Sequence, residues 1–448
     1  MVNNLTEGKP LKLLFFFAMP MVVGNLFQQL YNMVDSMVVG RFVGEDALAA
    51  VGSSFPVVFL SVAIAAGLSM GCTVVISQFF GAGKILEMKI TVSTALISLG
   101  VIGLIIMGIG EIIAGPLLTL LGTDPDIMAD SLAYLRIYFG GAVFLFLYNS
   151  LNGIYNALGD SQTPLKFLMV SALTNIVLDL LFVIQFNTGV AWATLIAQGM
   201  CAVFSFFVLI ARLRKMENEE AAKGKSFTFF DMSSAERIAK VGVPSMLQQS
   251  IVSISMMLMQ GLVNSYGKVF VAGYTAATKI DTLAMMPNMN FSNAMSSYAA
   301  QNIGARKMDR VKQGYKASMF MVVVFSLIIT SIIFLFGPQL LGLFLKQGAE
   351  GSAMSYGLSY MKTVSVFYIL MGALFVSNGL LRGAGDMGAF MLSSVVNLFS
   401  RVAIAYLLAH FIGASAIWWS IPTGWAVGAL FSFLRVRSGK WMARRLVD

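Results

Sequence analysis

The stretches QFFGAGK at residues 78–84 and QNIGARK at residues 301–307 share the pattern Q-x-x-G-A-x-K and lie 223 residues apart. A second pair, NGIYNALGDS at residues 152–161 and NGLLRGAGDM at residues 378–387, lies 226 residues apart. Two unrelated motifs that recur at nearly one separation indicate that the second half of the chain repeats the first. We therefore expect a fold built from two similar halves.

The composition places both halves in a membrane. Of 448 residues, 58% are hydrophobic and 11% are charged, whereas soluble proteins carry about 25% charged residues. Apolar segments of about 20 residues can cross a hydrocarbon core of about 30 Å as a helix. In the first half such segments start near Leu11, Ala47, Ile90, Leu132, Leu165 and Gly189. In the second half they start near Val241, Val269, Gly314, Met354, Met387 and Gly413. The sequence predicts an all-α integral membrane protein of about twelve transmembrane helices.

The domain organisation follows from the duplication. Pro20 and Pro244 lie early in the first span of their halves, 224 residues apart, which agrees with the period of the motifs. An even number of spans per repeat gives both copies one orientation, so a parallel pseudo-two-fold axis is expected to relate two six-helix lobes. The predicted domains are an N-lobe over residues 1–211, a charged cytoplasmic connector over 212–240 and a C-lobe over 241–448.

The net charge of +9 reflects topology rather than affinity for nucleic acid. If both termini are cytoplasmic, 23 basic residues fall on the inner side and 5 on the outer side, as the positive-inside rule requires. We expect a multi-pass protein of the cell (inner) membrane that does not bind nucleic acid. Cys72 and Cys201 lie in apolar segments and His410 is the sole histidine, so neither an enzyme centre nor a cofactor is expected.

A polar stripe follows the first span. Asn25, Gln28, Gln29, Asn32 and Asp35 recur at helical spacing and share one face of an otherwise apolar helix. An ionisable group inside the hydrocarbon costs several kcal/mol unless it is paired or hydrated. The stripe indicates a wet cavity that ends at Asp35, and hydrogen bonding between helices is the alternative.

Two further spans carry oxygen ligands at a comparable depth. Asn175 and Asp179 are one helical turn apart in the fifth span, and Thr194 lies early in the sixth. Together with Asp35 they provide hard oxygen ligands that suit a monovalent cation or a proton relay, with Na⁺ expected at Asp35, Asn175 and Asp179. The alternative is a purely structural hydrogen-bonded network.

The second half has changed this equipment. At the repeat offset Asn397 corresponds to Asn175, and Arg401 corresponds to Asp179. A tethered positive charge in place of the acid predicts a single ion site, in the first half. Asp281 is expected to pair with Arg401 or with Lys279, and both a structural and a gating role for this C-lobe charge network remain open.

Methionine is abundant in the second half, and flexible thioethers can repack around unlike apolar ligands. Methionine also serves as ordinary filler, so the two interpretations stand side by side. The residues expected to line a substrate cavity are Gln28, Asn32, Gln248, Met256, Met259, Met285 and Met289.

These landmarks together resemble the multidrug and toxic compound extrusion (MATE) family of secondary transporters. The resemblance implies two six-helix lobes arranged as a V, with alternating access driven by inward Na⁺ or H⁺. In one bacterial branch it implies a cation site at Asp35, Asn175, Asp179 and Thr194, with a carbonyl near Val190. Another branch has a glutamate in span seven, where this sequence has no acid.

The leading hypothesis is a secondary active antiporter, probably the simplest unit being a monomer in the lipid bilayer, that exports small amphipathic or cationic organic compounds. The alternative is a flippase of lipid-linked precursors from the same fold superfamily, which predicts several arginines along a cavity that holds pyrophosphate. The sequence does not separate Na⁺ from H⁺ as the coupling ion, because aspartates serve both.

Overall fold

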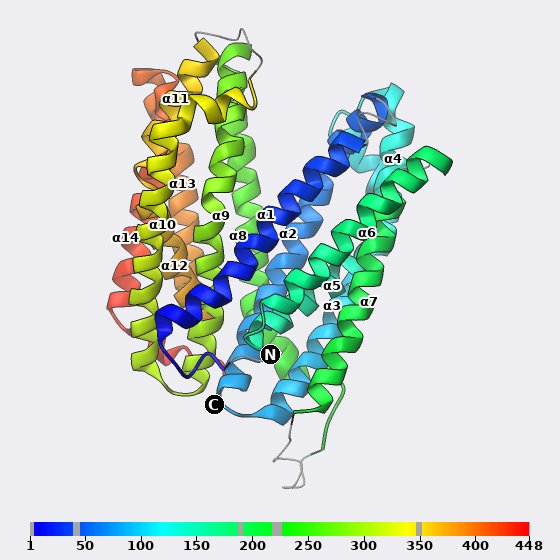
Figure 1. The fold of residues 1–448 in the computed structure, drawn as a ribbon, viewed down its shortest axis with the longest axis vertical. Helices are drawn as coiled ribbons and strands as arrows, with labels where there is room; N and C mark the ends of the chain where they lie inside the picture. The colour runs from blue at the N-terminus through cyan, green and yellow to red at the C-terminus, as the bar shows by residue number, and fades with distance from the viewer. Residues whose placement is uncertain (1–3, 39–44, 187–190, 217–225, 346–351, 448) are drawn as a thin grey trace. The chain divides into compact units, whose positions relative to one another are not determined.

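The computed structural model describes residues 4–38, 45–186, 191–216, 226–345 and 352–447. Within these ranges the chain forms fourteen α-helices, two short 3₁₀ helices and no strand (Figure 1). The all-α fold expected from the apolar segments is confirmed.

The helices follow the expected order of spans. Those of the first half are α1 (Pro10–Val38), α2 (Glu45–Gly81), α3 (Ile85–Leu120), α4 (Met128–Gly140), α5 (Ala142–Ala157), α6 (Gln162–Phe186) and α7 (Ala191–Arg214). Those of the second half are α8 (Met232–Asn264), α9 (Lys268–Gly304), α10 (Met308–Gly342), α11 (Ser352–Ser365), α12 (Tyr368–Ala384), α13 (Met387–Ile412) and α14 (Ser415–Arg437). The 3₁₀ helices are η2 (Pro125–Ile127) and η4 (Lys440–Ala443).

Two spans in corresponding positions are broken rather than straight. Among the described residues nine single helices are long and apolar enough to cross a membrane, and two bent pairs bring the number to 11. The pair formed by α4 and α5 bends by 49°, and the pair formed by α11 and α12 bends by 53°. The 37-residue α9 is long enough as well but richer in polar residues. With α9 included, the helices account for every expected span start.

Contacts between Cα atoms group the chain into two compact units. Unit 1 consists mainly of Val23–Leu247, and unit 2 consists of Leu5–Val22 and Gln248–Asp448. The expected lobes covered 1–211 and 241–448. In the structure α1 divides between the units after Val22, and α8 divides after Leu247. Each division falls three residues after a proline, at Pro20 or Pro244.

Hydrogen bonds explain why the start of the chain belongs to unit 2. The Leu5 amide donates to Gln301 Oε1 at 3.0 Å, and Asn302 Nδ2 donates to the Leu5 carbonyl at 3.2 Å. Lys307 Nζ donates to the Thr6 carbonyl at 3.1 Å. The second Q-x-x-G-A-x-K motif therefore binds the segment that leads into α1.

The first copy makes the equivalent arrangement with the segment that leads into α8. Ser93 Oγ of α3 donates to the Phe229 carbonyl at 2.6 Å, and the Asp231 amide donates to Thr94 Oγ1 at 3.0 Å. The beginning of α8 is thereby fixed to unit 1, as the beginning of α1 is fixed to unit 2.

A close helix contact extends this attachment along α8. A Cβ on Gly71 of α2 would lie 2.7 Å from the Gly242 amide nitrogen of α8. Such an approach of two backbones requires glycine on α2, and small residues at helix contacts are typical of membrane proteins, where packing rather than hydrophobic exclusion holds helices together.

Candidate functional site

The strongest cluster of polar side chains in unit 1 joins three helices. Tyr31 and Asp35 come from the later part of α1, Asn175 and Asp179 from α6, and Thr194 from the first turn of α7. Asp179 is fully buried and Asn175 is 2% exposed. The structure thus brings together the four side chains that the sequence analysis chose, and Val190 lies outside the described residues.

Asn175 is the hub of this cluster. Its hydrogen bonds are satisfied when the amide nitrogen faces Asp179, which then receives a bond at Oδ2 of 2.7 Å, while the Tyr31 hydroxyl lies 3.2 Å from the same nitrogen. In that orientation the amide oxygen accepts from the Thr194 backbone amide at 3.0 Å and from Thr194 Oγ1 at 3.3 Å. One carboxamide therefore connects α1, α6 and α7.

The two acids meet directly. The carboxyl groups of Asp35 and Asp179 lie within hydrogen-bonding reach of each other. Each acid also keeps one buried oxygen, Oδ1, that has no hydrogen-bond partner among the described residues. Two carboxylates at such a distance repel each other strongly unless a proton or a cation lies between them. The arrangement is chemically suited to bind and release one positive charge.

The donor set limits which ion the cluster can hold. Among the described residues no three His, Cys, Asp or Glu side chains gather closely enough to hold a metal ion. Carboxylate, carboxamide and hydroxyl oxygens without nitrogen or sulfur ligands do not favour a transition metal. A proton or a hard monovalent cation fits this set.

Tyr31 is a member of the cluster that the sequence analysis missed. It lies one helical turn before Asp35 and therefore on the same face of α1. The stripe was recognised from carboxamides and an acid, and a tyrosine in an apolar helix passes for an ordinary membrane aromatic. The spacing to Asp35 was the available signal.

The remaining polar residues of that stripe bond along the helix. Gln28 Nε2 donates to Asn32 Oδ1 at 3.1 Å, four residues further on, and Asn32 is exposed. Gln248, the corresponding kind of residue on α8, is half-buried in unit 2.

In unit 2 the buried acid has aromatic partners. Asp281 of α9 is 7% exposed and accepts a hydrogen bond from the Tyr360 hydroxyl at 3.0 Å and another from the Tyr368 hydroxyl. Neither Arg401 nor Lys279 forms an ion pair with Asp281 in the described structure. The sequence analysis looked for an opposite charge, whereas phenolic hydroxyls satisfy the carboxylate.

Asp281 therefore bonds to both sides of a broken span. Tyr360 belongs to α11 and Tyr368 is the first residue of α12, across the 53° bend. The aromatic core of unit 2 surrounds these residues, with the Phe270 and Trp418 rings stacked at a centroid distance of 5.3 Å. The carboxylate acts as a tie that fixes the bend.

The other members of the expected C-lobe network lie apart from that tie. Lys279 is exposed, with its Nζ 5.6 Å from the centroid of the Phe344 ring. Arg401 of α13 interacts with the Tyr274 side chain, and only its charge reaches Asp281. Asn397 lies one turn before Arg401, and a Cβ on Gly424 of α14 would lie 2.9 Å from its Oδ1.

The methionines do not share one environment. Met259 is 1% exposed and packs inside the hydrophobic core of unit 2, where no ligand reaches it, and Met285 packs against that core. Met256 and Met289 are 52% and 46% exposed. The abundance of methionine in this half thus includes ordinary core packing.

The repeated G-D turn has a function in packing that the sequence analysis did not assign. Arg212, in the last turn of α7, pairs with Asp160, and Arg435, in the last turn of α14, pairs with Asp386. Both acids are buried, at 2% and 4% exposed. Each repeat therefore ties the start of its fifth span to the end of its sixth.

A second missed charge is Arg382, in the last turn of α12. Its guanidinium donates from Nε to Ser296 Oγ at 3.2 Å and from Nη2 to Asn293 Oδ1 at 2.9 Å. The sequence analysis counted Arg382 with the cytoplasmic loops, but the side chain is 6% exposed and packs inside unit 2.

Comparison with known proteins agrees with this architecture. The MatE family model matches residues 20–181 and again 244–407, once in each half of the chain. The probable multidrug resistance protein YpnP of Bacillus subtilis is 31% identical over 453 residues, which cover 99% of this chain and 98% of its own length. The probable multidrug resistance protein YoeA of the same organism is 29% identical and covers 93% of this chain and 91% of its own length.

Solved structures give the same result. A MOP superfamily transporter from Pyrococcus furiosus superposes with a TM-score of 0.88 at 26% identity, covering 98% of both chains. A multidrug resistance MATE family transporter of the MOP superfamily, in an outward-facing conformation, gives a TM-score of 0.87 at the same identity and coverage. These relatives are transporters and not enzymes. With a family model that matches both halves and a relative similar over its whole length, the chain belongs to the MatE family.

Proposed function

We propose that this protein is a secondary active antiporter that exports small amphipathic or cationic organic compounds in exchange for inward H⁺ or Na⁺. The observation that carries the proposal is the contact between the Asp35 and Asp179 carboxyl groups, with Asn175 bonded to Asp179. Relatives named as multidrug resistance proteins support export of many compounds.

The coupling step is a change of charge at one place. When a proton or Na⁺ enters between Asp35 and Asp179, the repulsion between the carboxylates is removed and α1 can pack closely on α6. When the ion leaves, the repulsion returns and favours a different packing of α1 against α6 and α7. An ion that binds the two packings with different affinity shifts the balance between them, which is the requirement for coupled transport.

The direct meeting of the carboxyl groups favours H⁺ as the coupling ion. A single proton satisfies a pair of carboxyls in hydrogen-bonding contact, as in other enclosed acid pairs. Na⁺ takes several oxygen ligands around it, which Asn175 and Thr194 would have to help supply.

Unit 2 contributes structure rather than a second coupling site in this proposal. Asp281 already receives two hydroxyl donors, and the repeat counterpart of Asp179 is Arg401, a fixed positive charge. The excess of basic residues on one side of the spans supports cytoplasmic termini in the cell membrane. A monomer in the lipid bilayer is sufficient, because all four coupling residues belong to unit 1.

The experiment is dye efflux from vesicles that contain the purified protein, with the Na⁺ and pH gradients imposed separately. A pH gradient alone is expected to drive efflux in the native protein and to fail in Asp179→Asn. The matched control is Glu111→Gln, which removes an exposed unit 1 acid that faces Arg136 at 3.7 Å. Efflux that neither gradient drives, or full coupling in Asp179→Asn, would contradict the proposal. Efflux driven only by Na⁺ would change the ion and keep the site. Movement of lipid-linked pyrophosphates without dye efflux would favour a flippase.

A further inference from the structure

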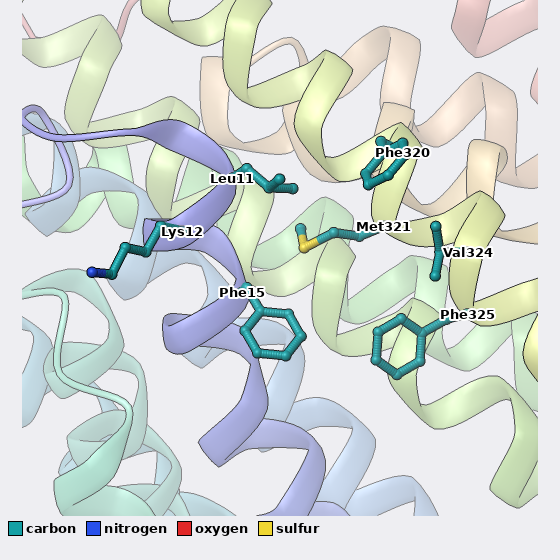
Figure 2. Close-up of a pocket in the computed structure, with 7 residues that line it drawn as sticks. All are labelled: Leu11, Lys12, Phe15, Phe320, Met321, Val324 and Phe325. Atoms are coloured by element: carbon teal, nitrogen blue, oxygen red, sulfur yellow. The ribbon is translucent and has the colours of Figure 1, made fainter.

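A groove of apolar side chains runs between α1 and α10 of unit 2. Its volume is about 330 Å³. Figure 2 shows the phenylalanine and aliphatic side chains of the two helices around the groove, with the Lys12 ammonium turned toward its margin. The lining residues are Leu11, Lys12, Phe15, Phe320, Met321, Val324 and Phe325.

Both helices begin at the same end of the groove. Arg310 Nη2, in the first turn of α10, donates to the Gly8 carbonyl at 3.0 Å, two residues before α1 begins. The groove starts about one turn further along each helix, at Leu11 and Phe320. One end of it is therefore next to the helix starts, and the other extends toward the middle of the spans.

Three lysines surround the end with the helix starts. Lys9 and Lys12 belong to the beginning of α1, and Lys316 lies one turn before Phe320 on the same face of α10. All three are exposed, and their ammonium groups have no hydrogen bond or ion pair with another described residue. The neighbouring bases are engaged, because Arg310 binds the Gly8 carbonyl and Lys312 pairs with Asp309.

The other repeat lacks this combination, although its helices correspond position for position. At the repeat offsets Lys12 corresponds to Glu236 and Phe15 to Ala239, while Lys316 corresponds to Ser93. Ser93 donates to the Phe229 carbonyl. The duplicated fold alone therefore requires neither the aromatic lining nor the lysines, and the groove has a chemistry of its own.

We propose that this groove binds an anionic glycerophospholipid of the surrounding bilayer. One acyl chain lies along the phenylalanines, and the phosphate group is held by Lys12 and Lys316. Basic pockets between membrane helices bind anionic head groups through their charge, and long lysine side chains can extend from an apolar wall to a head group. A zwitterionic lipid gains the same apolar contact but lacks the net charge.

The test measures lipid binding to the full-length purified protein. Delipidated protein is titrated with phosphatidylglycerol or with phosphatidylcholine of identical acyl chains, and bound lipid is counted by native mass spectrometry. Phosphatidylglycerol is expected to bind more tightly. Lys12→Gln/Lys316→Gln is expected to weaken phosphatidylglycerol binding about tenfold or more and to leave phosphatidylcholine unchanged.

Two controls separate a site from general attraction to a basic surface. Lys166→Gln/Lys240→Gln removes two exposed lysines of unit 1 and should leave phosphatidylglycerol binding unchanged. Val324→Trp, which fills the groove and retains every lysine, should weaken binding as the lysine variant does. Equal affinity of the native protein for both lipids, or equal loss in the two lysine variants, would overturn the proposal.

A second readout does not depend on variants of the lysines. Leu11→Trp places an indole at the groove from a position that is 43% exposed. Phosphatidylglycerol with brominated acyl chains should quench the added fluorescence more than brominated phosphatidylcholine does. Equal quenching by the two lipids would mean that only bulk bilayer contacts this surface.

Discussion

Asp386 accepts a hydrogen bond from Arg435 Nε at 2.7 Å, and both partners are largely withdrawn from solvent. The pair joins the turn before α13 to the last helical turn of α14. Asp160 and Arg212 do the same in unit 1, so the duplication has preserved an ion pair as well as a run of helices. Removal of one partner leaves a buried charge without compensation.

Asp160→Ala is expected to destabilise the protein more than Asp386→Ala. Asp160 also caps α6, where its Oδ1 accepts from the amides of Gln162 and Thr163, each at 3.0 Å. The lost cap adds about 1 kcal/mol to the loss of the ion pair. Thermal unfolding in detergent measures the difference, and Asp160→Ala/Arg212→Gln should recover part of the loss. Equal unfolding temperatures for the two single variants would contradict this prediction.

The Asp160 pair also predicts a dependence on pH. Burial alone would raise the pKa of Asp160, but hydrogen bonds from Thr163 and Arg212 outweigh it and hold the pKa below its ordinary value. A depressed pKa stabilises the folded state at every pH above the unfolded value of about 3.9. The stability difference between the native protein and Asp160→Asn should remain constant from about pH 7 to 5 and shrink below about pH 4. A difference that shrinks already near pH 6 would disprove it.

Asn175→Ala is expected to impair coupling while the protein stays folded. The substitution removes the bonds that join Asp179 to Thr194 and Tyr31, and loss of an outer ligand-positioning group reduces activity about tenfold in metal sites. Initial rates of gradient-driven dye efflux provide the measurement. Asn397→Ala, at the repeat counterpart, is the matched control and should retain transport. An equal decrease in both variants would argue for general packing damage.

Tyr360→Phe and Tyr368→Phe should each destabilise unit 2 by about 1–3 kcal/mol, because each leaves Asp281 with one donor fewer in a buried place. The double variant should exceed either single change. Tyr406→Phe is the comparison, since the exposed Tyr406 hydroxyl merely donates to the Leu258 carbonyl at 3.0 Å. Unfolding temperatures that do not distinguish these variants would remove the tie across the bend.

The sequence predicts the fold and one cluster because both depend on regular spacing. Apolar segments and the doubled motifs define the spans, and helical periodicity places Asn175 beside Asp179. The depth of Thr194 in the next span follows from the rise per residue. These relations hold for any straight helix, so they need no knowledge of tertiary contacts.

Other features depend on partners that carry no local signal. Nothing around Leu5 indicates that Gln301 will accept its amide hydrogen, 296 residues away. Charge reasoning assigned a basic partner to Asp281, whereas the tyrosine hydroxyls come from a span that breaks between α11 and α12. Met259 looked like any other methionine until packing placed it in the core.

The attachment of residues 5–22 to unit 2 has a consequence for biosynthesis. The first residues to leave the ribosome bond to Gln301 and Asn302, which are synthesised only after most of the chain. The beginning of α1 must therefore wait in the membrane without its final neighbours while α2 to α9 are inserted. Unit 1 can close as soon as residues 232–247 emerge, so maturation should finish at the amino terminus.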